Sequence, residues 1–255
     1  MENVVKNRFL PVMLAWAVHL YTALGLVAAA GIAVAIVQGS PETFRIAFIL
    51  MFVATVVDAT DGTLARKVRV KEVLPGFDGR RLDDLVDFLT YTFLPLLLIW
   101  RAEILPTEMA WVLLIPLLAS AYGFCQVSAK TEDGYFLGFP SYWNLVAFYL
   151  YVLRPGQWEG TILLVGLALL TFVPSRYLYP TQRGMLNLCT NILAVVWAGL
   201  LIWILLGSNW DDTKLTMGKV MTLGSLFFPV YYLSVSWIIT LRLWKRRWEM
   251  SKPPS

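Results

Sequence analysis

The sequence has few charged residues and almost no histidine or cysteine. Only 15% of its 255 residues are charged, against about a quarter in an ordinary soluble domain. The single histidine, His19, is too few for a histidine metal cluster. Two cysteines, Cys125 and Cys189, both lie inside apolar runs, where we expect them to be buried small hydrophobic side chains rather than a redox or metal site.

Apolar residues take the place of the missing charges. They make up 58% of the chain and form runs long enough to cross a bilayer, which takes about 20 residues. The first run, Val12–Val37, is too long for the core of a cleavable signal peptide. We therefore expect an all-α integral membrane protein with about eight transmembrane helices. The expected spans are residues 12–37, 44–66, 79–101, 108–127, 141–154, 160–176, 187–207 and 218–242.

The basic residues are divided unevenly between the two ends of these spans. With the N-terminus in the cytoplasm, the outer side receives only five of the 21 Lys and Arg residues, namely Arg45, Arg101, Arg154, Lys214 and Lys219. This division agrees with the positive-inside rule and predicts that both termini are cytoplasmic. The net charge of +4 is therefore interpreted as a topology signal, and no nucleic-acid partner is expected.

The most informative stretch begins at Asp58, where the second apolar run ends. Asp58 and Asp61 are three residues apart, so their side chains share one face of a helix. Gly79, Asp83 and Asp87 are spaced by four residues and also share a face. The two helices are expected to be antiparallel neighbours, so the two acidic faces can meet near headgroup depth on the cytoplasmic side.

Four carboxylates brought together in this way would repel one another strongly without cations. Because they offer only oxygen, they suit Mg²⁺ or Mn²⁺, and the balance of charge favours two ions together with a substrate diphosphate. Arg66 can hold phosphate oxygens with its forked guanidinium group. Gly62, Ala65 and Gly79 are small enough to let a nucleotide approach the backbone.

Two further acids and an alternative reading belong to this region. Asp84 lies about 100° around the helix from Asp83. We expect it, like Asp78, to be a supporting or surface acid. The alternative is that all these acids belong to a surface loop, balanced by basic neighbours. Those neighbours are Arg66, Lys67, Arg80 and Arg81.

The pattern D-x2-D-G-x2-A-R, followed after a spacer by G-x3-D-x3-D, resembles the signature of the CDP-alcohol phosphatidyltransferase family. Every signature position is present: Asp58, Asp61, Gly62, Ala65, Arg66, Gly79, Asp83 and Asp87. The spacer, residues 67–78, is longer than in most members. This spacer, the eight-span layout and the stretches 19–25 and 133–144 are similar to the bacterial phosphatidylcholine synthase branch of the family.

The resemblance implies a metal-dependent transfer of the phosphatidyl group from CDP-diacylglycerol to choline, which gives phosphatidylcholine and CMP. It implies that Asp58, Asp61, Asp83 and Asp87 hold the metals, and that Asp87 is also the base for the acceptor hydroxyl. The expected CDP- and diphosphate-binding residues are Gly62, Ala65, Arg66, Gly79 and Thr22. His19 is expected to bond within the helix bundle and to line the site with Thr22.

The resemblance also implies the setting of this chemistry. A single transmembrane domain is expected over residues 1–255, in the bacterial inner membrane, with the active site at its cytoplasmic face. By analogy with the family, the protein is expected to form a homodimer.

Choline would need a particular kind of pocket, because a trimethylammonium group cannot donate ordinary hydrogen bonds and is recognised by aromatic faces and nearby negative charge. Trp143 is the first choice. The full set of candidates is Trp143, Tyr142, Tyr135, Tyr177 and Tyr179, with Asn144 and Glu132 as polar neighbours. Alternatively, these aromatic residues are ordinary anchors at the membrane interface.

Other acceptors and another class of protein stay open at this point. A phosphorylated acceptor, such as glycerol phosphate, would need clustered arginines, for which Arg176 and Arg183 are candidates unless they only set topology. Serine and inositol are further acceptors, and CDP-choline donating to diacylglycerol ranks lower. The rival class is a cation carrier, in which the acids form an ion path. It is disfavoured because the four acids gather near one interface and Arg66 would oppose a cation.

Overall fold

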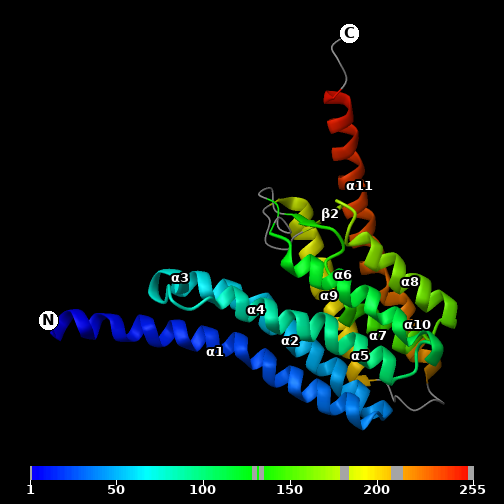
Figure 1. Ribbon diagram of the computed structural model, residues 1–255, viewed down its shortest axis with the longest axis horizontal. Helices are drawn as coiled ribbons and strands as arrows, with labels where there is room; N and C mark the ends of the chain where they lie inside the picture. The colour runs from blue at the N-terminus through cyan, green and yellow to red at the C-terminus, as the bar shows by residue number, and fades with distance from the viewer. Residues whose placement is uncertain (1, 128–130, 132–134, 179–183, 208–214, 252–255) are drawn as a thin grey trace. The chain divides into compact units, whose positions relative to one another are not determined.

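The computed structural model describes residues 2–127, 131, 135–178, 184–207 and 215–251. The chain divides into two compact units, Met1–Ala102 and Glu103–Ser255, and each is described by itself. Apart from one two-stranded ribbon, the described elements are helices (Figure 1). The expected helical class is confirmed.

The first unit is built on two long helices, α1 (Glu2–Gln38) and α2 (Pro41–Val68), which pack along each other (Figure 1). Gly39, at φ +70°, ends α1 in a left-handed conformation that glycine adopts without strain. Ser40 then caps α2: its Oγ accepts from the backbone N–H of Thr43, and the Thr43 hydroxyl accepts from that of Ser40. This tight connection makes α1 and α2 antiparallel neighbours.

The chain returns through one nearly continuous helical stretch. After the short α3 (Val70–Val73) it forms α4 (Gly79–Asp87), a π-helical segment η1 (Phe88–Phe93) and α5 (Leu94–Arg101). α1 contacts α4, η1 and α5. Gly25 of α1 permits this approach, because a Cβ at that position would collide with the side chain of Val86. The expected span 79–101 is thus a helix whose middle turn is wider than an α-helix.

The second unit contains shorter helices and the ribbon. Its elements, in order, are the 3₁₀ segment η2 (Thr107–Leu113), α6 (Leu114–Cys125), β1 (Tyr135–Leu137), α7 (Trp143–Leu153), α8 (Gln157–Leu170), β2 (Arg176–Leu178), α9 (Met185–Gly207), α10 (Leu215–Ser225) and α11 (Phe227–Met250). β1 and β2 are antiparallel, with Phe136 opposite Tyr177.

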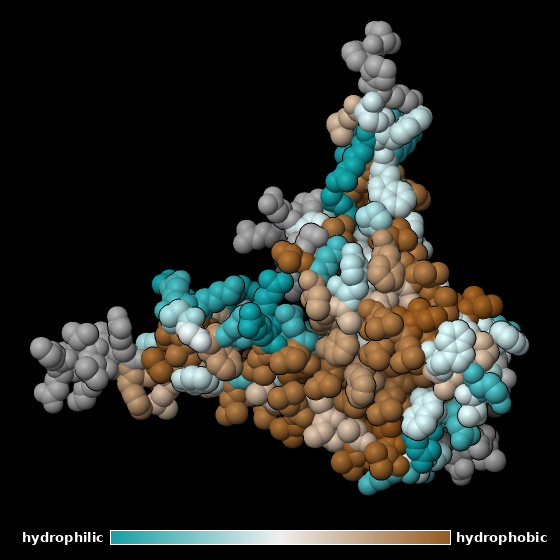
Figure 2. All heavy atoms as spheres, in the orientation of Figure 1, coloured by the Kyte–Doolittle hydropathy of each residue, from teal (hydrophilic) through white to brown (hydrophobic). Residues whose placement is uncertain are grey.

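In the part of the chain that the structure describes, five helical stretches are long and apolar enough to cross a membrane: Phe9–Gln38, Pro41–Val68, Thr107–Cys125, Met185–Gly207 and Lys219–Met250. Only 17% to 39% of the most apolar window of each is buried by the protein itself. Figure 2 shows apolar side chains over the helical surfaces, with hydrophilic ones around α3 and α4 and at the C-terminal end of α11. Uncovered apolar surface of this extent fits contact with lipid. The chain is a multi-pass helical membrane protein.

Two sequence expectations need correction or refinement here. α7 lies within the expected span 141–154, and α8 overlaps the expected span 160–176 but ends at Leu170; both helices are shorter than the five stretches. Cys125 and Cys189 were expected to be buried, and this is wrong, because both are exposed on the apolar surface of their helices. A helix that faces lipid has no need to bury a small apolar side chain within the protein.

Candidate active site

The acidic site lies entirely within the first unit. α2 does not stop where its apolar run ends, but continues through Asp58 and Asp61 to Val68. Its 28 residues span about 42 Å at 1.5 Å per residue, and the hydrocarbon core of a bilayer is about 30 Å thick. The two acids near its C-terminal end can therefore lie at headgroup depth.

α4 supplies the second acidic face. Asp78 caps its N-terminus, where its carboxylate accepts from the backbone N–H groups of Arg80 and Arg81 at 3.2 and 3.3 Å. The helix then carries Asp83 and Asp87 one turn apart, so that both project toward the same side. The cap fixes where α4 begins and therefore which residues face α2.

Three of the four expected ligands come together. One carboxylate oxygen each from Asp58, Asp83 and Asp87 lies within 4.8 Å of the others, and all three residues are half-buried. Oδ1 of Asp87 is buried and has no hydrogen-bond partner among the described residues. A buried carboxylate oxygen without a donor is costly. The oxygen-only donor set and this unpaired oxygen fit a hard divalent cation such as Mg²⁺ or Mn²⁺.

Asp61, the fourth expected ligand, is close by but engaged differently. Its side chain is buried, and its Oδ2 accepts a hydrogen bond of 2.7 Å from the hydroxyl of Thr22 on α1. It lies outside the group of three acids, yet near enough to Asp87 for the two charges to repel. The expected place of Thr22 beside the site agrees with this contact, and the ligand role of Asp61 stays a prediction.

A residue that the sequence analysis did not single out completes the cluster. Tyr91, in the π-helical segment, donates its hydroxyl hydrogen to Oδ2 of Asp58 at 2.8 Å. In η1 the N–H of Leu94 bonds to the carbonyl of Leu89, five residues earlier. This wider turn directly follows Asp87 and changes the direction of the side chains after it. The hydroxyl of Tyr91 orients one acid of the cluster.

The comparison with known proteins places this geometry in a family. The sequence model of the CDP-alcohol phosphatidyltransferases matches residues 15–173. The chain belongs to the CDP-alcohol phosphatidyltransferase family. The matched range contains all the acids of the site and extends from the first compact unit into the second.

Relatives whose name is phosphatidylcholine synthase match over most of their length. The protein from Pseudomonas aeruginosa is 39% identical over 192 residues, which cover 74% of this chain and 79% of the relative. That from Borreliella burgdorferi is 32% identical over 210 residues, covering 82% and 88%. That from Bradyrhizobium diazoefficiens is 37% identical over 212 residues, covering 82% and 76%. The expected resemblance to this branch is confirmed.

The remaining signature residues surround the acids. Arg66 is exposed and donates to the hydroxyl of Thr63 at 3.0 Å. A Cβ at Gly62 would lie 3.4 Å from Nη1 of Arg66, so the guanidinium group lies across this glycine. Ala65 packs against the buried cluster of Ala15, Val18 and Val70. Its small size is thus used in packing, while Arg66 stays open to a ligand.

Gly79 has a packing role that the motif alone does not reveal. A Cβ there would lie 2.5 Å from Cε1 of His19, so the imidazole ring rests on the start of α4. The ring also lies 4.3 Å from that of Phe77 and 5.9 Å from that of Trp16. His19 is buried, and its Nε2 has no hydrogen-bond partner among the described residues. The expected contact of His19 within the bundle is therefore mainly an aromatic one.

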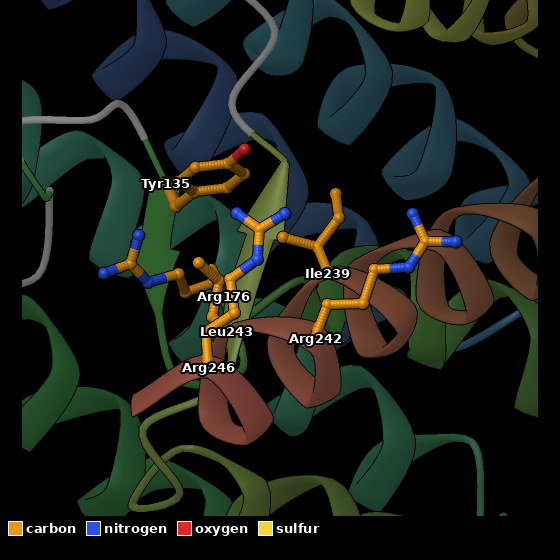
Figure 3. Close-up of a pocket in the computed structure, with 6 residues that line it drawn as sticks. All are labelled: Tyr135, Arg176, Ile239, Arg242, Leu243 and Arg246. Atoms are coloured by element: carbon orange, nitrogen blue, oxygen red, sulfur yellow. The ribbon is translucent and has the colours of Figure 1, made fainter. Parts of the chain in front are cut away.

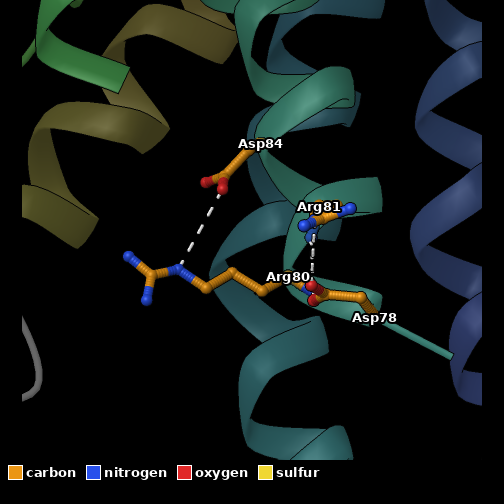
Figure 4. Close-up of polar contacts among 4 residues, drawn as sticks. All are labelled: Asp78, Arg80, Arg81 and Asp84. Carbon is orange, nitrogen blue, oxygen red and sulfur yellow. Dashed lines mark hydrogen bonds and ion pairs between the residues drawn. The ribbon is translucent and has the colours of Figure 1, made fainter. Parts of the chain in front are cut away.

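The supporting acids behave as expected. Asp78 pairs with Arg81 at 3.2 Å and Asp84 with Arg80 at 4.0 Å (Figure 4). All four side chains are between 45% and 86% exposed, so these pairs add little to stability. Their partners, Arg80 and Arg81, are basic neighbours on the same helix.

The choline candidates lie in the second unit. Trp143 is fully buried, and its indole N–H donates to the hydroxyl of Ser120 at 2.6 Å. Tyr142 and Tyr177 lie 6.4 and 6.3 Å, ring centre to ring centre, from Tyr232.

Two other candidates are described. Asn144 is buried in the first turn of α7, and the ring of Tyr135 lies 5.5 Å from the guanidinium carbon of Arg176. Glu132, Tyr179 and Arg183 lie outside the described residues.

Proposed function

We propose that this protein transfers the phosphatidyl group from CDP-diacylglycerol to choline and releases CMP. The observation that carries the proposal is the convergence of Asp58, Asp83 and Asp87 at one end of two membrane helices, in a chain with the complete family signature. Relatives named phosphatidylcholine synthase, which match most of this chain, support choline as the acceptor.

The acids and Arg66 have separate tasks in this reaction. Asp58, Asp61, Asp83 and Asp87 would hold the metal, Mn²⁺ or Mg²⁺, with two ions favoured by the charge balance. When bound, divalent cations neutralise the diphosphate and stabilise charge on the transferring and leaving groups. The guanidinium of Arg66, exposed above Gly62, binds diphosphate oxygens in its fork.

Asp87 acts on the acceptor. The choline hydroxyl attacks the phosphorus that bears the diacylglycerol, and Asp87 takes the hydroxyl proton as the new O–P bond forms. The O–P bond to CMP breaks, and CMP leaves with its negative charge. The position of Asp87 in the cluster supports this role, because its Oδ1 has no hydrogen-bond partner among the described residues and can accept the proton.

The nucleotide part of the donor would lie against the small residues of the two acidic helices. Gly62 is near the C-terminal end of α2 and Gly79 begins α4, while Ala65 packs toward α1 and Thr22, on α1 itself, donates to Asp61. Tyr91 holds Asp58 in place and is a positioning residue.

The setting of the reaction is also part of the proposal. We place the protein in the bacterial inner membrane, crossing it about eight times, with both termini and the acidic site on the cytoplasmic side. The distribution of Lys and Arg supports this orientation. We take residues 1–255 as one functional domain that works as a homodimer, by analogy with the family.

Choline recognition is assigned to aromatic residues of the second unit, with Trp143 first among them. Because the Trp143 indole is buried and bonded to Ser120, its replacement by Ala also opens a cavity. Trp143→Phe retains an aromatic face and serves as the milder variant. Both changes should raise the KM for choline more than the KM for CDP-diacylglycerol, and equal effects would remove Trp143 from the pocket.

One experiment tests the proposed function directly. Purified protein is supplied with CDP-diacylglycerol, Mn²⁺ and equal amounts of choline, serine, inositol and glycerol phosphate, and the lipids formed are identified by mass spectrometry. Phosphatidylcholine should be the main product, with one CMP released for each. Another product lipid would overturn choline as the acceptor. No lipid and no CMP, with cation flux into sealed vesicles instead, would favour a carrier.

A further inference from the structure

A second polar site lies in the Glu103–Ser255 unit, apart from the acidic cluster. It is a pocket of about 290 Å³ (Figure 3). Its lining residues are Tyr135, Arg176, Ile239, Arg242, Leu243 and Arg246. All of them except Tyr135 lie beyond residues 15–173, the part of the chain that matches the family. The transferase signature therefore does not account for this pocket.

The pocket is built where α11 docks against β2. Hydroxyl groups of Tyr232, Ser236 and Thr240, spaced by four residues on one face of α11, all bond to this strand. Thr240 accepts from the backbone N–H of Arg176 at 2.8 Å, and Tyr232 donates to the carbonyl of Leu178 at 2.9 Å. These bonds satisfy the edge of a short strand and hold Arg176 over the helix.

The same helix supplies most of the lining. Ile239, Arg242, Leu243 and Arg246 recur at intervals of three and four residues, so they share one face of α11. In Figure 3 the guanidinium group of Arg176 lies between those of Arg242 and Arg246 in the view. The pocket thus combines three positive groups with two apolar side chains.

The two-stranded ribbon orients Arg176. Leu137 of β1 is directly opposite Arg176 of β2, so Tyr135 is its diagonal neighbour on the same face. The guanidinium carbon of Arg176 lies 5.5 Å from the centre of the Tyr135 ring. This cation–π contact holds the guanidinium plane in a fixed direction.

The positive charge of the pocket favours binding of an anion. None of its six lining side chains is acidic. The nearby acid on α11, Glu249, pairs with Lys245 at 3.9 Å, and Lys245 does not line the pocket. Three arginines on one small surface repel one another, and a bound anion relieves this repulsion. Arginine forks match the geometry of phosphate oxygens.

The position of the pocket near the basic end of a membrane span indicates that the anion is part of a lipid. The candidate span that contains α11 runs for 32 residues, or about 48 Å, whereas the hydrocarbon core is about 30 Å thick. The basic C-terminal end of α11 therefore extends into the headgroup region. Ile239 and Leu243 add apolar side chains to the pocket beside the arginines, which suits a lipid whose phosphate meets the guanidinium groups.

We propose that Arg176, Arg242 and Arg246 form a binding site for the headgroup phosphate of an anionic phospholipid. The site belongs to the second unit and the acidic cluster to the first, and occupancy of the site is measured by binding rather than by activity. Phosphatidylglycerol is the probe. Inorganic phosphate is the alternative occupant, because it offers the arginines the same phosphate oxygens.

The test counts lipids that stay on the full-length protein. Protein in neutral detergent micelles is mixed with phosphatidylglycerol, and retained lipid is counted by native mass spectrometry. The variant Arg242→Gln/Arg246→Gln should retain at least fivefold less phosphatidylglycerol than the wild type. The matched control, Lys245→Gln/Arg247→Gln, removes two charges from the same turns of α11 outside the pocket and should change retention less than twofold.

Each outcome decides the matter. Equal losses in the two double variants would show attraction to general surface charge and overturn the site. Binding of inorganic phosphate by calorimetry, without retained phosphatidylglycerol, would overturn the lipid as occupant. Arg176→Lys keeps the charge but loses the planar stack on Tyr135, so it should show an intermediate loss. This single change decides the outcome if the double variant does not elute as a folded protein.

Discussion

Asp87 is the residue on which the proposed chemistry depends most. It belongs to the group of three acids, and its buried Oδ1 has no hydrogen-bond partner among the described residues. Asp84, three positions earlier on the same helix, has a side chain that is 45% exposed and is paired with Arg80. The two acids have the same side chain, and their different surroundings give them different roles.

Asp87→Asn should reduce transfer at least about 100-fold, because the change removes both a general base and a charged metal ligand. The measurement is the rate of phosphatidylcholine formation from CDP-diacylglycerol and choline. Asp84→Asn is the control, and it should stay within about twofold of the wild type, since its exposed ion pair contributes little. Near-normal turnover in Asp87→Asn would exclude both proposed roles.

Tyr91→Phe tests a residue that acts through Asp58. Loss of the 2.8 Å hydrogen bond should weaken metal binding about tenfold, because partners of ligating groups typically tune affinity by that amount. The Mn²⁺ concentration for half-maximal rate should rise, while the KM for choline stays unchanged. Tyr149→Phe removes a buried hydroxyl bonded to Ser225 in the other unit and should leave the Mn²⁺ requirement unaltered. If Tyr91→Phe and Tyr149→Phe had the same Mn²⁺ requirement, Tyr91 would have no role in positioning a metal ligand.

The acidic helices could be predicted from spacing, but one of their turns could not. The sequence alone predicts which acids share a helix face. The spacing is three residues between Asp58 and Asp61, and four between Asp83 and Asp87. The π-helical turn at Phe88–Phe93 depends on packing against α1 and α2, and no local pattern marks it. Tyr91 was missed for this reason, since its direction follows from that turn.

Gly79 illustrates the same limit at the level of helix packing. Its place in the motif suggests room for a nucleotide, and the structure shows His19 of α1 resting against it. Whether a small residue of the signature contacts a ligand or a neighbouring helix depends on contacts between distant segments. The exposure of Cys125 and Cys189 has a similar origin, because a sequence does not reveal which side of an apolar helix faces lipid.

Gly79→Ala should lower stability by about 1–3 kcal/mol and reduce activity, because the added methyl group forces α4, with its acids, away from His19. Thermal unfolding and transfer rate are measured together. Gly76→Ala, where a Cβ meets nothing within 4 Å, should remain within about 0.5 kcal/mol of the wild type. His19→Ala combined with Gly79→Ala should recover part of the activity. No recovery would mean that the glycine is needed for the ligand itself.

At the scale of the whole molecule, composition already indicated the membrane. Low charge and long apolar runs predicted helical spans, and five stretches meet that expectation. Their uncovered apolar surface is suited to contact with lipid. The clustered acids of the first unit repel one another in the absence of a cation, so binding of the cation should stabilise the fold.

Mn²⁺ should raise the unfolding temperature of the chelator-treated protein by roughly 5 °C or more, since saturation at 100 times the dissociation constant adds about 2.7 kcal/mol. Transfer activity should disappear on chelation and return with Mn²⁺. In Asp58→Asn/Asp83→Asn the shift should vanish, and the metal-free variant should be at least as stable as the metal-free wild type, because repulsion within the acidic cluster is relieved. Full activity after exhaustive chelation would contradict the metal site.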